Sequence, residues 1–246
     1  MRKQIFIYIL LIPLILICLS FNNNKRSIDD GRGLIRKIYK THSDSWYSNL
    51  TFKQEMFRYR DDSLIGNEVW LVAYSASGNL HIRYEDFDSG RGWLITNDTL
   101  YTFNHDKLIG EKPRLHDIMT LGLDIFITPP ADIIGKIESM GFDLSLLAKT
   151  TIKGNKVFQV GDPDDQCFWI YEDELLFYGL RRVDKTGVKE IFFEKYETFY
   201  DKPVATQIQY FQDGEMYLLE KYFDVRMPSC LPDDFFDPDL FNSTRW

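Results

Sequence analysis

The sequence predicts an α+β fold built on a strongly curled antiparallel half-barrel of about ten or eleven strands. Apolar residues alternate with period two from Trp46 to Phe103 and again from Asn155 to Met227. A segment of helical periodicity, from Pro113 to Thr150, separates these two strand-rich halves. So many consecutive strands exceed what a flat open sheet holds, because sheets twist. We therefore expect a half-barrel covered by an N-terminal helix and by a helical lid insertion.

The first residues carry the pattern of an export signal. Arg2 and Lys3 precede an uncharged apolar run, and the small residues Cys18 and Ser20 suit cleavage after Ser20. The sequence thus predicts a signal peptide over residues 1–20, a single half-barrel domain over residues 21–246, and a periplasmic location. Two alternatives stay open, an uncleaved membrane anchor and a lipid attached to Cys18.

Charge and motifs exclude several classes of function. Without Arg2 and Lys3 the chain has 27 Lys and Arg against 37 Asp and Glu, which opposes a nucleic-acid partner. The sequence has no nucleophile elbow, no H-E-x-x-H, no C-x-x-C and no glycine-rich phosphate loop, and its four histidines are not paired at ligand spacing. We expect no cofactor, no metal and no enzymatic activity. A hydrolase using its many carboxylates is a distant alternative.

The first predicted element is a helix between Asp30 and Ser43. Leu34, Ile35, Ile38 and Tyr39 recur at helical spacing, with Lys and Arg on the opposite side. The helix therefore has one apolar face for a sheet to cover.

The first strands alternate in a way that places large apolar side chains on one face. The stretch "NEVWLVAYSASGNLHIRYEDF" predicts a hairpin turning at "SASGN", and "GWLIT" and "TLYTF" form a second hairpin about Asn97 and Asp98. His81 and Arg83 alternate away from the apolar face. The residues predicted to line a cavity on that face are Trp70, Val72, Tyr74, Leu80, Ile82, Tyr84, Trp93 and Ile95.

The insertion predicts two helices separated by "TPP" at residues 128–130. Gly122 and Gly141 lie within or beside its apolar stripes, and glycine lowers helix stability, so we expect this lid to be locally less stable than the sheet. A third short apolar piece, "DLSLLAK", follows Gly141. The predicted lid residues are Leu115, Ile118, Met119, Ile133, Ile134, Ile137 and Met140.

The second half predicts strands at "NKVFQV", "QCFWIY", "LLFYGLRRV" and "VKEIFFEKYETFY", then a hairpin turning at Asp213-Gly214. The tail "PSCLPDDFFDPDLF" is rich in Pro and Asp, and we expect it to lie over a sheet edge. Cys167 and Cys230 are an even pair outside the signal. An exported chain permits a disulfide between them, and two buried thiols are the equally weighted alternative.

The order of these elements resembles the periplasmic lipoprotein carriers of the LolA and LolB type, the outer-membrane lipoprotein-sorting proteins. The resemblance rests on the N-terminal helix, "TFKQEMF", "EVWLVAYSASGNLHIRYED", "LITNDTLYTFN" and the helical insertion, and it covers nearly all of the chain after the signal. It implies an incomplete barrel closed by helices over a hydrophobic cavity that shields acyl chains. The implied partners are an acylated lipoprotein or lipid, an inner-membrane export complex and an outer-membrane acceptor. We expect a monomer, although the sequence has no feature that fixes the oligomeric state.

This chain departs from the family at one turn. The best-known carriers have an Arg-Pro pair there, with the arginine tied to lid closure, whereas residues 74–79 read "YSASGN". Two functions from different classes therefore stand side by side. One is a carrier of acylated cargo with an open cavity, and the other is a structural or interaction module of the cell envelope whose core is filled.

Overall fold

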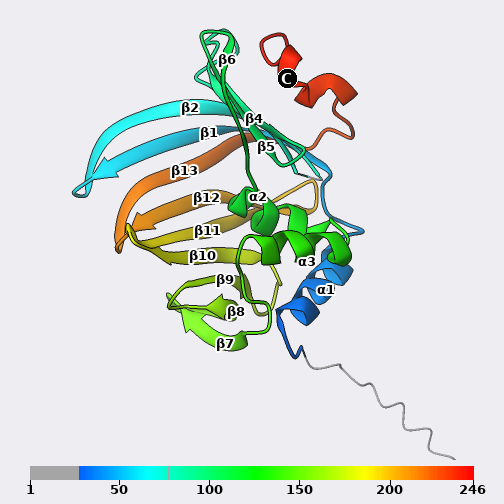
Figure 1. The fold of residues 1–246 in the computed structure, drawn as a ribbon, viewed down its shortest axis with the longest axis vertical. Coiled ribbons are helices and arrows are strands. Elements are labelled where there is room, and N and C mark those ends of the chain that lie inside the picture. Colours follow the sequence, from blue (N-terminus) through cyan, green and yellow to red (C-terminus); the bar gives the residue numbers. More distant parts are fainter. Residues whose placement is uncertain (1–27, 77) are drawn as a thin grey trace, which may run out of the picture.

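One antiparallel sheet makes up most of the molecule (Figure 1). The computed structural model describes residues 28–76 and 78–246, so the predicted signal peptide over residues 1–20 lies outside the described residues. Thirteen strands of the described chain pair in the order β6-β5-β4-β3-β2-β1-β13-β12-β11-β10-β9-β8-β7. They are β1 (Asn49–Arg60), β2 (Ser63–Ser75), β3 (Asn79–Tyr84), β4 (Gly92–Thr96), β5 (Thr99–Asn104), β6 (Lys107–Pro113), β7 (Leu147–Ile152), β8 (Asn155–Asp162), β9 (Gln166–Tyr171), β10 (Phe177–Asp184), β11 (Gly187–Phe199), β12 (Lys202–Gln212) and β13 (Glu215–Arg226).

The helices are few and short. The α-helices of the described chain are α1 (Gly31–His42), α2 (Asp117–Gly122) and α3 (Pro130–Ser139). Single turns of 3₁₀ helix occur at η1 (Asp124–Phe126), η2 (Asp233–Phe236) and η3 (Pro238–Leu240). The predicted break at "TPP" is confirmed, because α3 begins at Pro130. The helix before it is shorter than predicted, since α2 starts only at Asp117 and Leu115 lies ahead of it.

The topology forces the helical insertion across one face of the sheet. β6 and β7 are consecutive strands along the chain, yet they occupy the two opposite edges of the sheet. Their connection, residues 114–146, must therefore span the whole sheet. Figure 1 shows α2 and α3 of this connection in front of the central strands, which bend around them. The two edge strands do not pair with each other, so the barrel stays open.

The sequence prediction omits both edge strands, which accounts for its lower count. β6 follows a two-residue turn in which His105 and Asp106 have positive φ angles of 50° and 61°, a hairpin turn without glycine. All seven residues of β6 are exposed, so no apolar alternation marks it. β7 overlaps the end of "DLSLLAK" and is a strand where the sequence indicated only a short apolar piece. Edge strands have one unpaired, solvated side and so lack the pattern of central strands.

The N-terminal helix forms where the sequence predicts it. The Asp30 carboxylate caps the helix by accepting the backbone N–H of Gly33 at 2.7 Å. Leu34, Ile35 and Ile38 are fully buried, while Tyr39 is half-buried. The helix thereby closes one end of the sheet's concave face.

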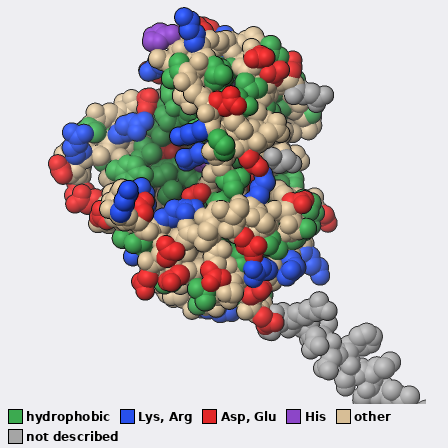
Figure 2. All heavy atoms as spheres, viewed as in Figure 1, with side chains coloured by type: hydrophobic (Ala, Val, Ile, Leu, Met, Phe, Trp, Pro, Cys, Tyr) green, Lys and Arg blue, Asp and Glu red, His purple; other side chains and the backbone are tan. Residues whose placement is uncertain are grey.

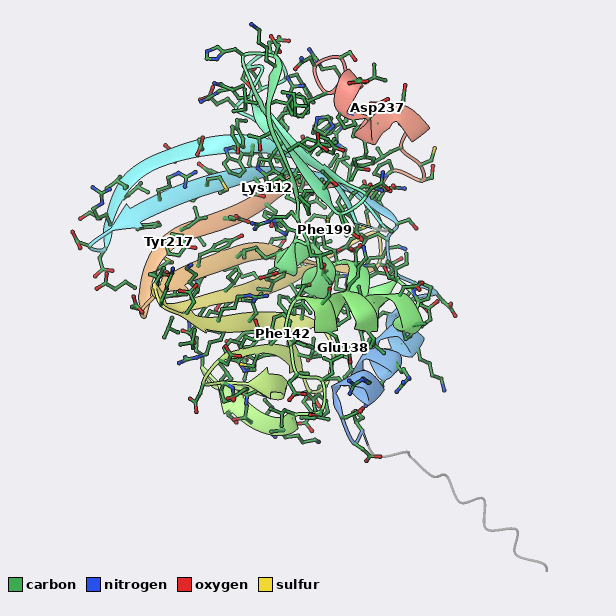
Figure 3. All side chains as sticks on the ribbon, viewed as in Figure 1. Lys112, Glu138, Phe142, Phe199, Tyr217 and Asp237 are labelled. Atoms are coloured by element: carbon green, nitrogen blue, oxygen red, sulfur yellow. The ribbon has the colours of Figure 1, made fainter. Side chains whose placement is uncertain are left out.

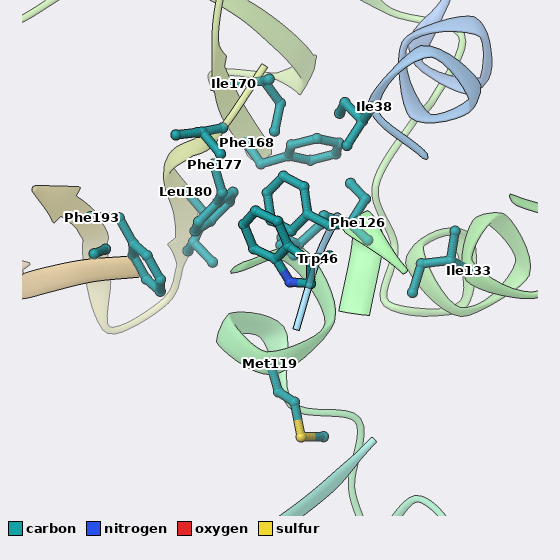
Figure 4. Packing of buried hydrophobic residues seen from close by; sticks show 14 of the residues in the cluster. Ile38, Trp46, Met119, Phe126, Ile133, Phe168, Ile170, Phe177, Leu180 and Phe193 are labelled. Atoms are coloured by element: carbon teal, nitrogen blue, oxygen red, sulfur yellow. The ribbon is translucent and has the colours of Figure 1, made fainter. Parts of the chain in front are cut away.

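Aromatic packing fills this closed end. Trp46 stacks on Phe126 of η1 with ring centroids 4.0 Å apart. Figure 4 shows the two rings together, with Ile38 of α1 and Phe168 of β9 beside them. Ile133 and Ile137 of α3 belong to the same buried cluster, and α3 contacts both α1 and η1. Side chains therefore fill the core at this end of the molecule.

The C-terminal tail covers a face of the sheet, not an edge as predicted. Phe241 is fully buried and stacks on Phe103 with centroids 3.8 Å apart. The Arg83 guanidinium donates to the Phe241 carbonyl oxygen at 2.6 Å, and the His81 ring stacks on the Phe241 ring. His81 and Arg83 alternate away from the lid side as predicted. The tail therefore covers polar side chains that would otherwise lie on the solvated face.

The two cysteines of the described chain do not form a disulfide. Cys167 lies on β9, buried with Trp169 and Phe192, whereas Cys230 is exposed after β13. β10, β11 and β12 lie between β9 and β13, a separation of roughly 19 Å at about 4.8 Å per strand. The segment after Cys230 leads to η2, which contacts β3 and β4 at the other half of the sheet. The disulfide predicted between Cys167 and Cys230 is therefore not present in this structure. The even number of cysteines, on which that prediction rested, carries no information about the distance between them.

Candidate functional site

A hollow lies between the concave face of the sheet and α2. This space, here called the trough cavity, has a volume of about 320 Å³ and is walled by β1, β2, β3, β4, β11, β12, β13 and residues 114–123. Figure 2 shows a hollow lined with hydrophobic side chains over β1 and β13, bordered by Lys and Arg. Tyr217, which lines the cavity, lies near the tip of the β12-β13 hairpin, far from Glu138 on α3 (Figure 3). The cavity thus opens away from the closed end.

Five of the eight predicted cavity residues line the trough cavity, and three do not. The lining residues are Trp70, Val72, Leu80, Ile82 and Trp93. Tyr74 and Ile95 are fully buried in the packed core. Tyr84 is absent from the lining, and its ring stacks on that of Trp70 with centroids 4.4 Å apart. Alternation along a strand predicts the face of the sheet on which a side chain lies. The position of that side chain along the strand decides whether it lines the cavity or packs in the closed end.

Only part of the predicted lid faces the cavity. Ile118 and Met119 of α2 line it, together with Leu123, which the prediction did not single out as a lining residue. Ile133 and Ile137 are buried at the closed end, and Ile134 and Met140 pack against the outside of that core. Leu115 lines a separate opening beside α3. α2 is therefore the roof of the cavity, and α3 anchors it.

The wall opposite α2 carries a buried carboxylate. Glu220 of β13 is 5% exposed and lines the cavity between Met56 of β1 and Ile208 of β12, its cross-strand neighbours. The Tyr222 hydroxyl donates to Glu220 Oε2 at 3.1 Å, and the Tyr210 hydroxyl also donates to this carboxylate. Burial raises the pKa of Glu220 to about 7, against the opposing effect of the two hydroxyls and of Arg58.

Sequence reasoning did not find Glu220, although a signal was present. Leu218, Glu220 and Tyr222 alternate along β13 and share the lid-side face. A carboxylate within an apolar alternation marks either a solvated face or a buried polar site, and the alternation does not distinguish the two. Glu220 is buried in the folded sheet, so it belongs to a buried polar site.

Cationic side chains lie at the rim of the cavity. Arg58 of β1 pairs with Glu68 of β2 at 2.6 Å, and both side chains are partly exposed. Arg114 precedes α2 and also lines the cavity. Next to it, the His116 ring stacks on Trp93 with centroids 5.7 Å apart, and burial lowers the His116 pKa to about 4. The positive charge at the rim therefore comes from its arginines, while Glu68 offsets the charge of Arg58 and the carboxylate of Asp117 also lines the cavity.

A polar contact ties the roof to the sheet at the closed end. The Tyr74 hydroxyl donates to Asp124 Oδ1 of η1 at 2.7 Å, and the backbone N–H of Gly78 donates to the same carboxylate. Lys136 of α3 pairs with Asp98 of the β4-β5 turn at 2.8 Å. The turn between β2 and β3 is thus joined to the lid by a carboxylate from the lid itself.

Other classes of site find little support in the part of the chain that the structure describes. Across residues 28–76 and 78–246, no three His, Cys, Asp or Glu side chains come together as a metal site would require. Within the same residues, none of the helices is both long and apolar enough to cross a bilayer.

Comparison with known proteins identifies the fold. No protein-family model and no curated protein matches the sequence. Among solved structures, a DUF1329 family protein from Desulfovibrio piger matches with TM-score 0.57 and 13% identity, over 86% of this chain and 97% of that chain. A LolA superfamily protein from Nitrosomonas europaea matches with TM-score 0.56 and 15% identity, over 83% and 98%. An outer membrane lipoprotein-sorting protein domain from Vibrio parahaemolyticus matches with TM-score 0.56 and 14% identity, over 85% and 97%. The chain therefore has the LolA-like fold that its order of elements predicts.

Proposed function

We propose that this protein binds acylated cargo, a lipoprotein or another lipid, with an acyl chain in the trough cavity. The proposal includes export to the periplasm and a role as carrier between an inner-membrane export complex and an outer-membrane acceptor. The protein acts as a non-catalytic monomer in this role. The single observation that carries the proposal is the largely apolar hollow of about 320 Å³ beneath a separate helical roof.

The physical chemistry of the hollow supports an acyl ligand. Burying an acyl chain contributes about 0.8 kcal/mol per methylene, so a chain enclosed by Val72, Ile82 and Leu218 binds without any polar anchor. The volume lies at the lower end of the roughly 300–1,000 Å³ typical of ligand pockets. Met56 and Met119 give the walls adaptable thioether side chains that suit cargo of variable shape.

Lipid extraction from the purified full chain tests the proposal directly. We expect the mass spectrum of an organic extract to contain acylated species, and a fluorescent fatty acid such as 11-(dansylamino)undecanoic acid to bind and be displaced by them. An extract free of lipid, together with no binding of the fluorescent acid, would favour the envelope module with a filled core.

A matched pair of lid variants locates the binding. Ile118→Glu places a carboxylate in the apolar roof of the cavity from a half-buried position, where burying it against an acyl chain would cost its hydration. Ile134→Glu makes the same change on α3, outside the trough cavity. We expect at least a tenfold weaker binding of the fluorescent acid for Ile118→Glu only. Ile82 is less suitable, because it is 4% exposed and a charge there would destabilise the fold.

A further inference from the structure

We propose that Glu220 recognises a neutral hydrogen-bond donor on the cargo, so that the trough cavity selects acyl amphiphiles carrying an amide N–H or a hydroxyl close to the acyl chain. This inference rests on the proposed function, because it assigns a polar recognition site within the same cavity. It goes beyond hydrophobic shielding, which requires no polar group in the wall.

The position of Glu220 supports recognition within the cavity and not at its mouth. Its cross-strand partner on β1 is Met56, two residues deeper than the rim residue Arg58. Phe52, farther along the same strand, lies deeper still, and its ring stacks on Tyr222 with centroids 4.2 Å apart. A polar group held at Glu220 would therefore have apolar wall on its inner side and the arginines on its outer side.

The two tyrosines do not exhaust the acceptor capacity of the carboxylate. An ionised carboxylate offers about four acceptor positions, and the hydroxyls of Tyr210 and Tyr222 occupy two of them. Both hydroxyls already point their protons at Glu220, so neither is available as a donor to cargo. The remaining acceptor positions belong to a side chain that lines the cavity. A buried polar group with free acceptor capacity gains most from a donor supplied by the ligand.

The surrounding charge favours a neutral donor over an ammonium group. Arg58 is close enough to Glu220 to stabilise the ionised carboxylate while it also pairs with Glu68, and Arg114 lines the same cavity. The carboxylate of Asp117 at the cavity is already paired with Arg182 at 2.8 Å, so it offers little to a cationic ligand. A cationic head group would pass both guanidinium groups and lose its own hydration on the way to Glu220. An amide or hydroxyl carries no net charge, so the guanidinium groups do not repel it and it loses less hydration. Its hydrogen bond to an ionised acceptor is of the stronger, charge-assisted kind.

The experiment compares ligands of equal chain length against three forms of the protein at pH 8, where Glu220 is ionised. The probes are dodecanamide, which has N–H donors, methyl dodecanoate, which has none, and dodecylammonium. The proteins are the wild type, Glu220→Met and Glu220→Gln, with Glu215→Gln as the control, an exposed position on the same strand. Affinities come from displacement of the fluorescent fatty acid.

We expect the wild type and Glu215→Gln to bind dodecanamide roughly tenfold or more tightly than methyl dodecanoate, as a hydrogen bond to a charged acceptor implies. Glu220→Met removes the acceptor and should make the two affinities equal, while Glu220→Gln, a neutral acceptor, should lie between. Equal affinities in the wild type would overturn the inference and leave acyl binding intact. So would dodecylammonium binding more tightly than dodecanamide.

Failure of the proposed function looks different, because no probe would then bind to any of the proteins. If Glu220→Met does not fold, the ratio of dodecanamide to methyl dodecanoate affinities in the wild type and in Glu220→Gln still decides. A ratio that is the same in these two proteins counts against Glu220 as the recognition site.

Discussion

The hydroxyl of Tyr74 donates a hydrogen bond to the carboxylate of Asp124 at 2.7 Å, and this contact joins β2 to the lid. Both side chains are buried, so the contact is shielded from water. Asp124 also accepts the backbone N–H of Gly78, in the turn between β2 and β3. The charged group that meets this turn therefore comes from the lid.

Removal of this hydrogen bond should loosen the lid. Tyr74→Phe leaves a buried carboxylate with one donor fewer, and we expect the unfolding free energy to fall by about 1–3 kcal/mol. Amide hydrogen exchange in α2 and η1 should accelerate more than in β1. Tyr200→Phe, at an exposed tyrosine, is the control and should change neither quantity. Unchanged exchange in α2 for Tyr74→Phe would show that the hydrogen bond does not hold the lid.

The same carboxylate makes the stability depend on pH. Burial raises the pKa of Asp124 from 3.8 to about 6, despite the hydrogen bond from Tyr74 and the charge of Lys136. A raised pKa in the folded state means that the contribution to stability is present below pH 3.8 and is lost as the pH rises through about 6. Asp124→Asn lacks this titration. We therefore expect its unfolding free energy, relative to wild type, to rise by roughly 2 kcal/mol between pH 4 and pH 7.

Urea unfolding of both proteins at intervals of pH measures this difference. Subtraction removes the opposite effect of His81 and His116, whose pKa values burial lowers to about 3 and about 4. A difference that stays constant across the range would mean that Asp124 titrates as an ordinary surface carboxyl.

The sequence predicts the central sheet and both covering layers, because their signals are local. The helix between Asp30 and Ser43, the "TPP" break and the turn at Asn97-Asp98 each rest on neighbouring residues, and each occurs as predicted. Glu220 and the tail could not be placed in this way. Whether Glu220 is solvated or buried depends on α2, a segment about a hundred residues away in the chain. The division of the trough into a filled end and a hollow end likewise depends on where Trp46 and Phe126 meet.

The state of the cysteines gives a direct chemical test. Cys230 is exposed, whereas Cys167 is buried and burial raises its pKa to about 12, which suppresses the reactive thiolate. With Cys18 in the predicted signal peptide set aside, a thiol reagent should label one cysteine in the native protein and two after denaturation without reductant. Peptide mapping should identify the fast site as Cys230. No label after denaturation would restore the predicted disulfide.

The C-terminal tail should be an integral part of the fold. Phe241 fills a site between Phe103 and Arg83, so Phe241→Ala should lower the unfolding free energy by about 3–5 kcal/mol. Leu240→Ala, at the neighbouring and more exposed position, should cost much less. Thermal unfolding followed by circular dichroism compares the two. Similar melting temperatures for these variants would show that the tail is not packed as described.

The fit of the lid on the sheet depends on the absence of a side chain at Gly122. A Cβ at this position would lie 2.8 Å from the ring of Phe193 on β11, closer than carbon atoms pack. Gly122 therefore allows α2 to approach the sheet, a role different from the loosening that its helical context predicts. A separate void of about 30 Å³, lined in part by Ile118, Leu123 and Phe193, lies beside this contact.

A pair of alanine variants separates close packing from helix propensity. Gly122→Ala should lower the unfolding free energy by about 1–3 kcal/mol, because the added methyl group overpacks the contact with Phe193. Gly135→Ala, in the interior of α3 with no atom near the added group, should raise it by about 0.4–1 kcal/mol through helix propensity. Urea unfolding measures both. Stabilisation by both substitutions would indicate that the roof does not rest on Phe193, and that Gly122 serves only to weaken the helix.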